Sequence, residues 1–391
     1  MRKLIANLQY VTTPALISLS VVGVLRGGDW VWLGAALLAA AIIADTILIT
    51  HTQGTGKDDQ GRPLGAAWFL NGLLYLTFPL FVAQQAVLVW RLHGYVTGAP
   101  IALPPEFVKL FAVHADTSGW QLVGATISVG IWQGMGIVFG HELSHTKGWT
   151  FILSRWIMAL SGTAHFSIAH VYNHHIDLGD AADPATAPRG RSLYQHFFLS
   201  HFGQSTFVAR AERKRLESAG KAVVSLRNRW IRGYLMSVPS VALFAVAGGW
   251  IGIAALAGVW VISNFELEVL NYLEHYGLVR VPDQPIAHRH SWDNDTVLTS
   301  VAFIEIGRQG DHHVRGETRF WDLEPTGAPN YGYGYLTLLV ITLVPPLWHA
   351  FMEPKLAIWD RDFATPAERA IAEEHSRRSG YATTRPAAAL V

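Results

Sequence analysis

The chain of 391 residues contains no cysteine. Disulfides, iron–sulfur clusters, thiolate zinc sites and cysteine nucleophiles are therefore excluded, and any redox metal must be held by nitrogen and oxygen ligands. Charged residues are also scarce, at 15% of the chain, against about a quarter in a soluble globular domain. The net charge of +1 gives no argument for a nucleic-acid partner. Half of the residues are hydrophobic, and this balance predicts a polytopic membrane protein.

Six segments are apolar over the roughly 20 residues that a helix needs to cross a bilayer. We expect an all-α fold of about six transmembrane helices in a single domain of residues 1–380, followed by a disordered tail at 381–391. Glycine pairs separate the first two spans, at Gly27–Gly28, and the last two, at Gly248–Gly249. The expected spans are 4–25, 29–50, 67–90, 118–140, 231–247 and 250–274.

The placement of lysine and arginine predicts the orientation of these helices. The segment 141–233 is rich in both residues, whereas the loop 92–117 holds a single lysine. Threading the spans from a cytoplasmic N-terminus brings the basic segment to the cytoplasmic side, together with three histidines at span ends, His51, His141 and His275. We therefore expect a multi-pass protein of the inner (cell) membrane whose N-terminus is cytoplasmic.

Two further apolar stretches are expected to lie at the membrane interface rather than to cross the bilayer. The stretch 149–169 contains Arg155, and the stretch 331–352 contains Pro345 and Pro346. Near the C-terminus, Thr365 is expected to cap a soluble helix, with Glu368 reaching back to it.

Histidines gather in four motifs, HELSH, HVYNHH, NYLEHYG and QGDHH. In HELSH and HVYNHH, two histidines stand four residues apart on one helix face, so that two imidazoles of one helix can meet a single metal ion. These pairs are His141 with His145 and His170 with His174. Adjacent histidines such as His174 and His175 diverge by about 100° on a helix and suit two different ions.

Each motif alone has a less specific interpretation. HELSH matches the HExxH of a zinc protease, with Glu142 as general base. HVYNHH fits a cluster tolerated in headgroup water, and His275 alone fits a structural role. Taken together, eight imidazoles exceed the three or four ligands of one zinc ion, so two metal ions fit the count. Iron is the metal that best suits imidazole ligands without thiolates.

The four motifs resemble the histidine boxes of the membrane fatty acid desaturase–hydroxylase superfamily. NYLEHYGL, with HSWDND downstream, is similar to the alkane hydroxylase branch. GDAADPATAPRG and TRFWDLEP look like the membrane components of xylene and p-cymene monooxygenases. The resemblance covers most of the chain from residue 130 to residue 375.

This resemblance implies a six-span helical protein with a non-haem diiron site (two iron ions, Fe2+/Fe3+) on the cytoplasmic side. It implies a monooxygenase that inserts one oxygen atom of O2 into an unactivated C–H (methyl) group of an apolar alkyl-aromatic or alkane substrate. No catalytic residue is implied beyond the metal site. The implied ligands are His141, His145, His170, His174, His175, His275, His312 and His313.

Gln309 stands where many alkane hydroxylases have histidine, and the sequence leaves open whether its amide binds iron. A ligating histidine usually donates its other N–H to a carboxylate or carbonyl. The candidates for that role are Glu142, Asp177, Glu274 and Asp311. For Asp180 and Asp183 the interpretation as loop acids or helix caps is favoured.

The reaction consumes two electrons, and the chain has no cysteine, nucleotide-binding fingerprint or haem motif to supply them. We expect a separate rubredoxin or ferredoxin-type reductase to dock on the cytoplasmic face, and the apolar small-molecule substrate to enter from the bilayer. The basic run at Arg213, Lys214 and Arg215 is a candidate docking patch, with an anchor against anionic lipid as an equally open alternative.

Two enzyme alternatives remain. A fatty-acyl desaturase of the same superfamily would use the same irons and make an alkene rather than an alcohol. An HExxH intramembrane zinc protease would leave most of the histidines unexplained.

Overall fold

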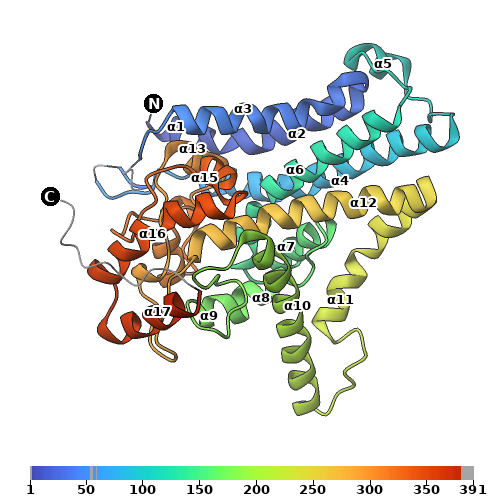
Figure 1. Ribbon diagram of the computed structural model, residues 1–391. Helices are drawn as coiled ribbons and strands as arrows, with labels where there is room; N and C mark the ends of the chain where they lie inside the picture. The colour runs from blue at the N-terminus through green and yellow to red at the C-terminus, as the bar shows by residue number, and fades with distance from the viewer. Residues whose placement is uncertain (1, 53–55, 59, 380–391) are drawn as a thin grey trace.

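The computed structural model describes residues 2–52, 56–58 and 60–379. Within these ranges the regular structure is helical, with three isolated β-bridges (Figure 1). The predicted all-α fold is thereby confirmed. The predicted disordered tail at 381–391 lies outside the described residues.

The first half of the chain forms the hairpins that lead to the HELSH motif. Its helices are α1 (Arg2–Leu8), α2 (Thr12–Arg26), α3 (Leu33–Ile47), α4 (Ala67–Thr97), α5 (Pro105–Phe111), α6 (Gly119–Ser144), α7 (Trp149–Leu160), α8 (Phe166–Ala169), the π-helix His170–His174 and α9 (His175–Asp177). Short 3₁₀ turns at Gln9–Val11 and Gly28–Trp32 join α1 to α2 and precede α3.

The second half supplies one long helical segment and a C-terminal cap of short helices. These are α10 (Leu193–Ser218), α11 (Arg229–Met236), α12 (Val238–His275), α13 (Val297–Ala302), α14 (Gln309–Val314), α15 (Tyr335–Thr342), α16 (Pro345–Asp362) and α17 (Pro366–Ser379). The 3₁₀ turns His288–His290 and Phe320–Asp322 lie between them.

Among the described residues, five helical segments are long and apolar enough to cross a membrane, and they overlap all six predicted spans. They are Arg2–Arg26, Gly28–Ile47, Ala67–Thr97, Gly119–Ser144 and Arg229–His275. The last has 47 residues, which as one straight helix would measure about 70 Å, twice the thickness of the hydrocarbon layer. Gly249 interrupts it with a φ of 56° and a ψ of −132°, and the chain turns back there. The fifth segment therefore contains the last two predicted spans.

Helix α6 is the centre of the bundle, and 83% of its most apolar stretch is buried. Its glycines let neighbouring helices approach closely, as small residues do in membrane bundles. A Cβ at Gly140 would lie 2.8 Å from Cγ2 of Ile157 on α7, and a Cβ at Gly130 would lie 2.8 Å from Cβ of Ile262 on α12. This packing holds α6 beside α12, so that the HELSH motif at the end of α6 lies near the end of α12.

The two stretches expected at the interface are not among the candidate spans. The first contains α7 and α8, and Arg155 of α7 is buried with Nη2 donating to the carbonyl of Arg229, 2.5 Å away. The second contains α15 and the start of α16. At the start of α17, Thr365 and Glu368 form the expected reciprocal cap, with N–O distances of 2.8 and 3.3 Å.

Arg91 of α4 closes the end of the bundle remote from the histidines. Its side chain is buried, with Nε donating to the carbonyl of Val24 at 2.8 Å and Nη2 donating to that of Leu25 at 2.5 Å. Both carbonyls lie in the last turn of α2, where no helical N–H is left to satisfy them. The guanidinium also binds the carbonyl of His114 in the following loop. One side chain thus ties α2, α4 and the loop before α6 together.

Replacing Arg91 with methionine should destabilise the protein by about 3 kcal/mol, because buried carbonyls lose their donors without gaining others. The measurement is the unfolding midpoint in mixed detergent micelles titrated with SDS. Lys109→Met, which removes a positive charge from the exposed helix α5 at the same end, is the control. Equal midpoints for the two variants would contradict the assigned role.

Candidate metal centre

Four separate segments deliver eight histidines to one end of the α6–α12 pair. The C-terminus of α6 supplies His141 and His145, and α12 ends at His275. The π-helical turn and α9 supply three more, and α14 supplies the last two. These remaining histidines are His170, His174, His175, His312 and His313.

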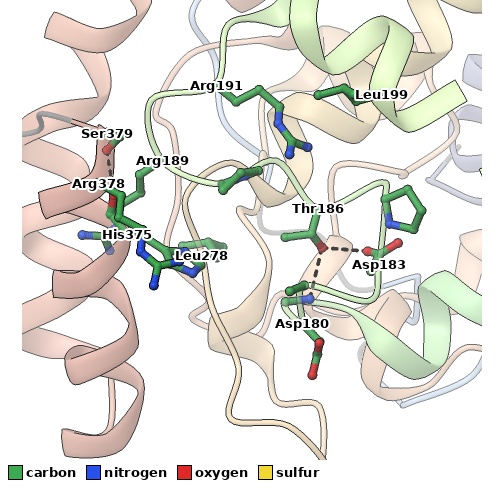
Figure 2. Close-up of a pocket in the computed structure, with 14 residues that line it drawn as sticks. Asp180, Asp183, Thr186, Arg189, Arg191, Leu199, Leu278, His375, Arg378 and Ser379 are labelled. Atoms are coloured by element: carbon green, nitrogen blue, oxygen red, sulfur yellow. Dashed lines mark hydrogen bonds between the residues drawn. The ribbon is translucent and has the colours of Figure 1, made fainter. Parts of the chain in front are cut away.

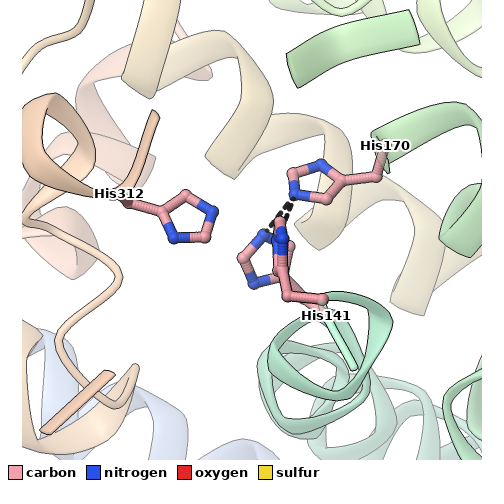
Figure 3. Close-up of side chains that lie close together, drawn as sticks. His141, His170 and His312 are labelled. Carbon is pink, nitrogen blue, oxygen red and sulfur yellow. Dashed lines mark hydrogen bonds between the residues drawn. The ribbon is translucent and has the colours of Figure 1, made fainter. Parts of the chain in front are cut away.

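One group of imidazoles is formed by His141, His145, His170 and His312, whose potential ligand atoms all lie within 4.8 Å of one another. Nε2 of His170 lies 2.7 Å from Nε2 of His141 and 3.0 Å from Nε2 of His145. In Figure 3 the imidazoles of His141, His170 and His312 approach one another from separate elements. His141 and His145 share a group, as their spacing predicts.

A second group lies beside the first and consists of His174, His275 and His313. The centroids of their rings are 4.7 to 4.9 Å apart. His175 lies between the groups, with its ring centroid 4.4 Å from that of His313 and its Nε2 atom 3.2 Å from Nε2 of His312. The structure therefore contains two adjacent places where a metal ion could be bound.

The HVYNHH motif departs from the predicted pairing of His170 with His174. Residues His170–His174 form a π-helix, in which the N–H of His175 donates to the carbonyl of His170. The wider turn places residues five apart on one side, and Nε2 of His175 lies 3.0 Å from Nε2 of His170. His174 faces the second group instead. The predicted divergence of His174 from His175 is seen in the structure.

The buried imidazoles suit a metal because their lone pairs are available. Burial, together with the neighbouring imidazoles, lowers the pKa of His145, His170, His175 and His313 well below the ordinary value, and that of His312 to about 4. Both ring nitrogens of His275 and of His313 are buried without a hydrogen-bond partner among the described residues. Such orphaned nitrogens are costly in a protein interior, and a bound cation would satisfy them.

The carboxylate that orients one of these imidazoles is Asp183, for which sequence reasoning favoured another role. Nδ1 of His174 lies 2.8 Å from Oδ2 of Asp183, and both side chains are buried. Thr186 Oγ1 donates to the same oxygen at 2.7 Å. Burial alone would raise the pKa of Asp183, and the contacts with His174 and Thr186 lower it below its usual value. With Nδ1 engaged in this way, Nε2 of His174 is left for a metal.

Three of the four carboxylates predicted to support histidines, those of Glu142, Asp177 and Asp311, have other principal contacts. Glu142 Oε1 accepts from the N–H of Phe320 at 3.4 Å, and Asp177 accepts from Asn173 at 2.7 Å. Asp311 accepts from the N–H of Glu324 at 2.7 Å and pairs with Arg315. Glu274 alone lies near a ligand candidate, with Oε2 4.0 Å from Nε2 of His275.

Gln309 is buried at the start of α14, three residues before His312. Its Nε2 donates to the carbonyl of Ile306 at 2.8 Å. Its Oε1 is buried without a hydrogen-bond partner among the residues that the structure describes. An amide oxygen in that state is able to accept from a water or to face a cation.

Other buried histidines stand outside both groups. His165 lies 3.2 Å from the hydroxyl of Tyr234, and His196 lies 3.7 Å from Glu268. His290 contacts Glu368 at 2.7 Å, so the carboxylate that caps α17 also anchors this helix to the HSWDND segment. This contact gives the HSWDND segment a structural role that the sequence left unassigned.

A family model described as fatty acid desaturase matches residues 118–342, which include all eight histidines. The chain belongs to the fatty acid desaturase family. The predicted superfamily is thereby confirmed.

Three curated relatives illustrate where this fatty acid desaturase family member lies among similar proteins. The xylene/toluene monooxygenase hydroxylase component XylM of Pseudomonas putida is 28% identical over 96% of both chains. Alkane 1-monooxygenase 1 of Pseudomonas aeruginosa is 32% identical over 64% of this chain and 69% of the relative. Alkane 1-monooxygenase of Ectopseudomonas oleovorans is 27% identical over 84% of this chain and 77% of the relative.

Replacing Asp183 with asparagine should lower metal affinity at the second group by about 10- to 100-fold, because a neutral amide replaces the charged carboxylate that fixes the His174 ring and raises its basicity. The measurement is competition with a chelator, followed by metal analysis of the detergent-purified protein. Asp180→Asn is the matched control, since Asp180 Oδ1 accepts only from the N–H of Ala182, at 2.9 Å. Equal metal retention in both variants would refute the orienting role.

Proposed function

We propose that this protein is the membrane-embedded hydroxylase of an oxygen-dependent monooxygenase with two iron ions. The names of its relatives bear out the prediction of a membrane monooxygenase. The observation that carries the proposal is the pair of adjacent imidazole groups at one end of the spanning helices. We propose that residues 1–380 form a single integral-membrane domain around them.

The eight histidines of the four motifs are the proposed ligands, and His175, which lies between the two groups, would hold either ion. Iron is proposed because the ligands are imidazoles without thiolates and the reaction requires a redox metal. When bound, two irons supply the activation of O2 that C–H hydroxylation needs. Gln309 is proposed as a weak ligand or as the acceptor of a water at the same site.

The residues of this chain would position the metal ions and exclude water from the site around them. The groups are buried at the ends of α6 and α12, and Trp132, Phe139 and Phe166 are buried in the same helical core. Excluding water in this way protects a reactive centre and strengthens the electrostatic interactions inside it. An apolar substrate dissolved in the bilayer reaches such a centre between the spanning helices without crossing water.

The balance of the reaction requires an external reductant. Converting R–H and O2 into R–OH and H2O consumes two electrons and two protons, and this chain has no cysteine for an iron–sulfur centre. A separate electron donor is therefore needed, and we propose a rubredoxin or a ferredoxin-type reductase. We also propose that the membrane is the inner (cell) membrane, with the N-terminus and the metal site cytoplasmic, as the lysine and arginine bias predicts.

The proposed substrate is an apolar compound with a methyl group, on an aromatic ring or at the end of an alkane. The ring is favoured because the similarity to a xylene/toluene monooxygenase component extends over 96% of the chain. A fatty-acyl desaturase is the alternative within the family. The zinc protease is disfavoured by the position of Glu142, whose Oε1 accepts from the N–H of Phe320 and lies 3.8 Å from Nη1 of Arg319.

The metal content of the purified protein tests the diiron proposal. Detergent-purified protein should contain about two irons per chain, as two imidazole groups require. His174→Ala should reduce the iron content, whereas His114→Ala, in the exposed loop at the other end of the bundle, should not. About one zinc and no iron would contradict the diiron proposal.

The product of the reaction distinguishes a hydroxylase from a desaturase. With m-xylene or n-octane, a reduced donor protein and ¹⁸O2, mass spectrometry should detect an alcohol carrying ¹⁸O, because one oxygen atom comes from O2. The same assay in H2¹⁸O under ordinary O2 is the control and should leave the alcohol unlabelled. An alkene without labelled alcohol would support the desaturase instead.

A further inference from the structure

A surface cavity lies beside the second imidazole group. It has a volume of about 530 Å³ and is bounded by the loop 179–191, by α10 and by α17. We call it the basic pocket, after the side chains Arg189, Arg191, His375 and Arg378 that line it. Figure 2 shows Asp183 and Thr186 on one side of the pocket and Arg189, His375 and Arg378 on the other. Gly190, with a φ of 82°, allows the loop to pack closely against Ser379 of α17.

Among the described residues of this pocket, Arg191 has a guanidinium without an ion pair or a side-chain hydrogen bond, and its backbone carbonyl accepts from the hydroxyl of Tyr272. Its guanidinium extends into the space between the two sides in Figure 2. The other arginines are already neutralised. Arg189 binds Asp360 at 2.6 and 2.8 Å, and Arg378 binds Glu374 at 2.6 Å. A partly buried guanidinium without a partner selects an anion, and carboxylates fit its planar fork.

The wall of the pocket leads directly to the metal centre. Asp183 lines the pocket, and its Oδ2 lies 2.8 Å from Nδ1 of His174 in the second group. The Asp183 side chain is fully buried, so a protein seated in the pocket would lie close to the loop that holds this carboxylate against His174, a proposed metal ligand. This is a short route for electrons from the surface to the buried centre.

The basic run suggested by the sequence is less suitable. Arg213 pairs with Glu217 at 2.8 Å, and Arg215 pairs with Glu212 at 2.7 Å. These residues lie toward the end of α10, which projects away from the rest of the protein (Figure 1). Their charges are largely satisfied, and the metal groups lie elsewhere.

We propose that the basic pocket is the docking site of the electron-donor protein, with a carboxylate of that protein bound by Arg191. This inference rests on the proposed function and adds the position at which electrons enter. The donor is expected to present an acidic patch, and its encounter with the pocket should weaken as ionic strength rises.

The test measures binding and turnover with the same partner. A purified rubredoxin and a purified ferredoxin-type reductase are each titrated against the detergent-solubilised chain at low ionic strength, and the tighter binder is kept. Arg191→Glu should raise the Kd for the donor, and the KM for the donor in turnover, on the order of ten-fold. The variant should retain its metal content and its kcat at saturating donor. Arg191→Lys should restore most of the affinity. Arg213→Glu, with the same change of charge on α10, should leave both constants unaltered.

Arg378→Glu is a second variant at the same pocket, on a side chain that is 74% exposed and tolerant of substitution. Arg378→Glu should also raise the Kd for the donor protein. If Arg191→Glu fails to retain metal, the Kd of Arg378→Glu decides whether the donor binds at the basic pocket. Unchanged constants at the pocket, equal effects of Arg213→Glu, or no binding of either donor would overturn the proposal. Weaker binding of Arg191→Glu to anionic lipid vesicles, with unchanged donor binding, would assign the pocket to a lipid headgroup instead. A chain that binds the donor through Arg191 but forms no product would contradict the proposed function alone.

Discussion

The packing of imidazoles against imidazoles is the constraint on which the rest of this structure depends. Ring nitrogens of His170, His141, His175 and His312 approach one another at 2.7 to 3.2 Å. In the same region Nδ1 of His170 and both ring nitrogens of His275 and His313 are buried without a hydrogen-bond partner among the described residues. Uncharged imidazoles cannot all donate to one another, and protonated ones would repel. A cation between them resolves both problems, because each lone pair then has a use. We therefore regard metal binding as part of what holds this end of the helices together.

The surrounding architecture brings the four histidine segments into that small volume. Glycines on α6 allow α7 and α12 to pack at short range, and the π-helical turn directs His170 and His174 to different groups. The segment between α12 and α15 packs at the left end of the long helices in Figure 1, and the His290–Glu368 contact anchors it to α17. Within the second group, His174 is the only imidazole with a carboxylate of the described residues against its Nδ1 atom.

In the proposed reaction, the substrate and the electrons reach the metal centre by different routes. An apolar substrate approaches from the bilayer along the spanning helices, where charged side chains are few. Electrons approach from the surface, where Arg191 faces a cavity whose wall includes the carboxylate bound to His174. Keeping these routes apart allows the centre to remain dry while a water-soluble partner binds nearby.

Hydrophobic run length was sufficient to predict the helical membrane fold, because it is a local property of the sequence. The family and the eight candidate ligands were predicted from the resemblance of four short histidine motifs to those of a known superfamily. The division of the histidines into groups was decided only by the tertiary structure, since the π-helical turn depends on packing and not on the i, i+4 spacing of His170 and His174. The tertiary structure also decided which carboxylate contacts His174. Asp311 and Asp177 are adjacent to the motifs and contact other residues, whereas Asp183 follows His174 by nine residues and returns to it through a loop. The tertiary structure also separates Arg191 from Arg189 and Arg378 of the basic pocket, because those two side chains pair with acids and that of Arg191 has no acid partner among the described residues.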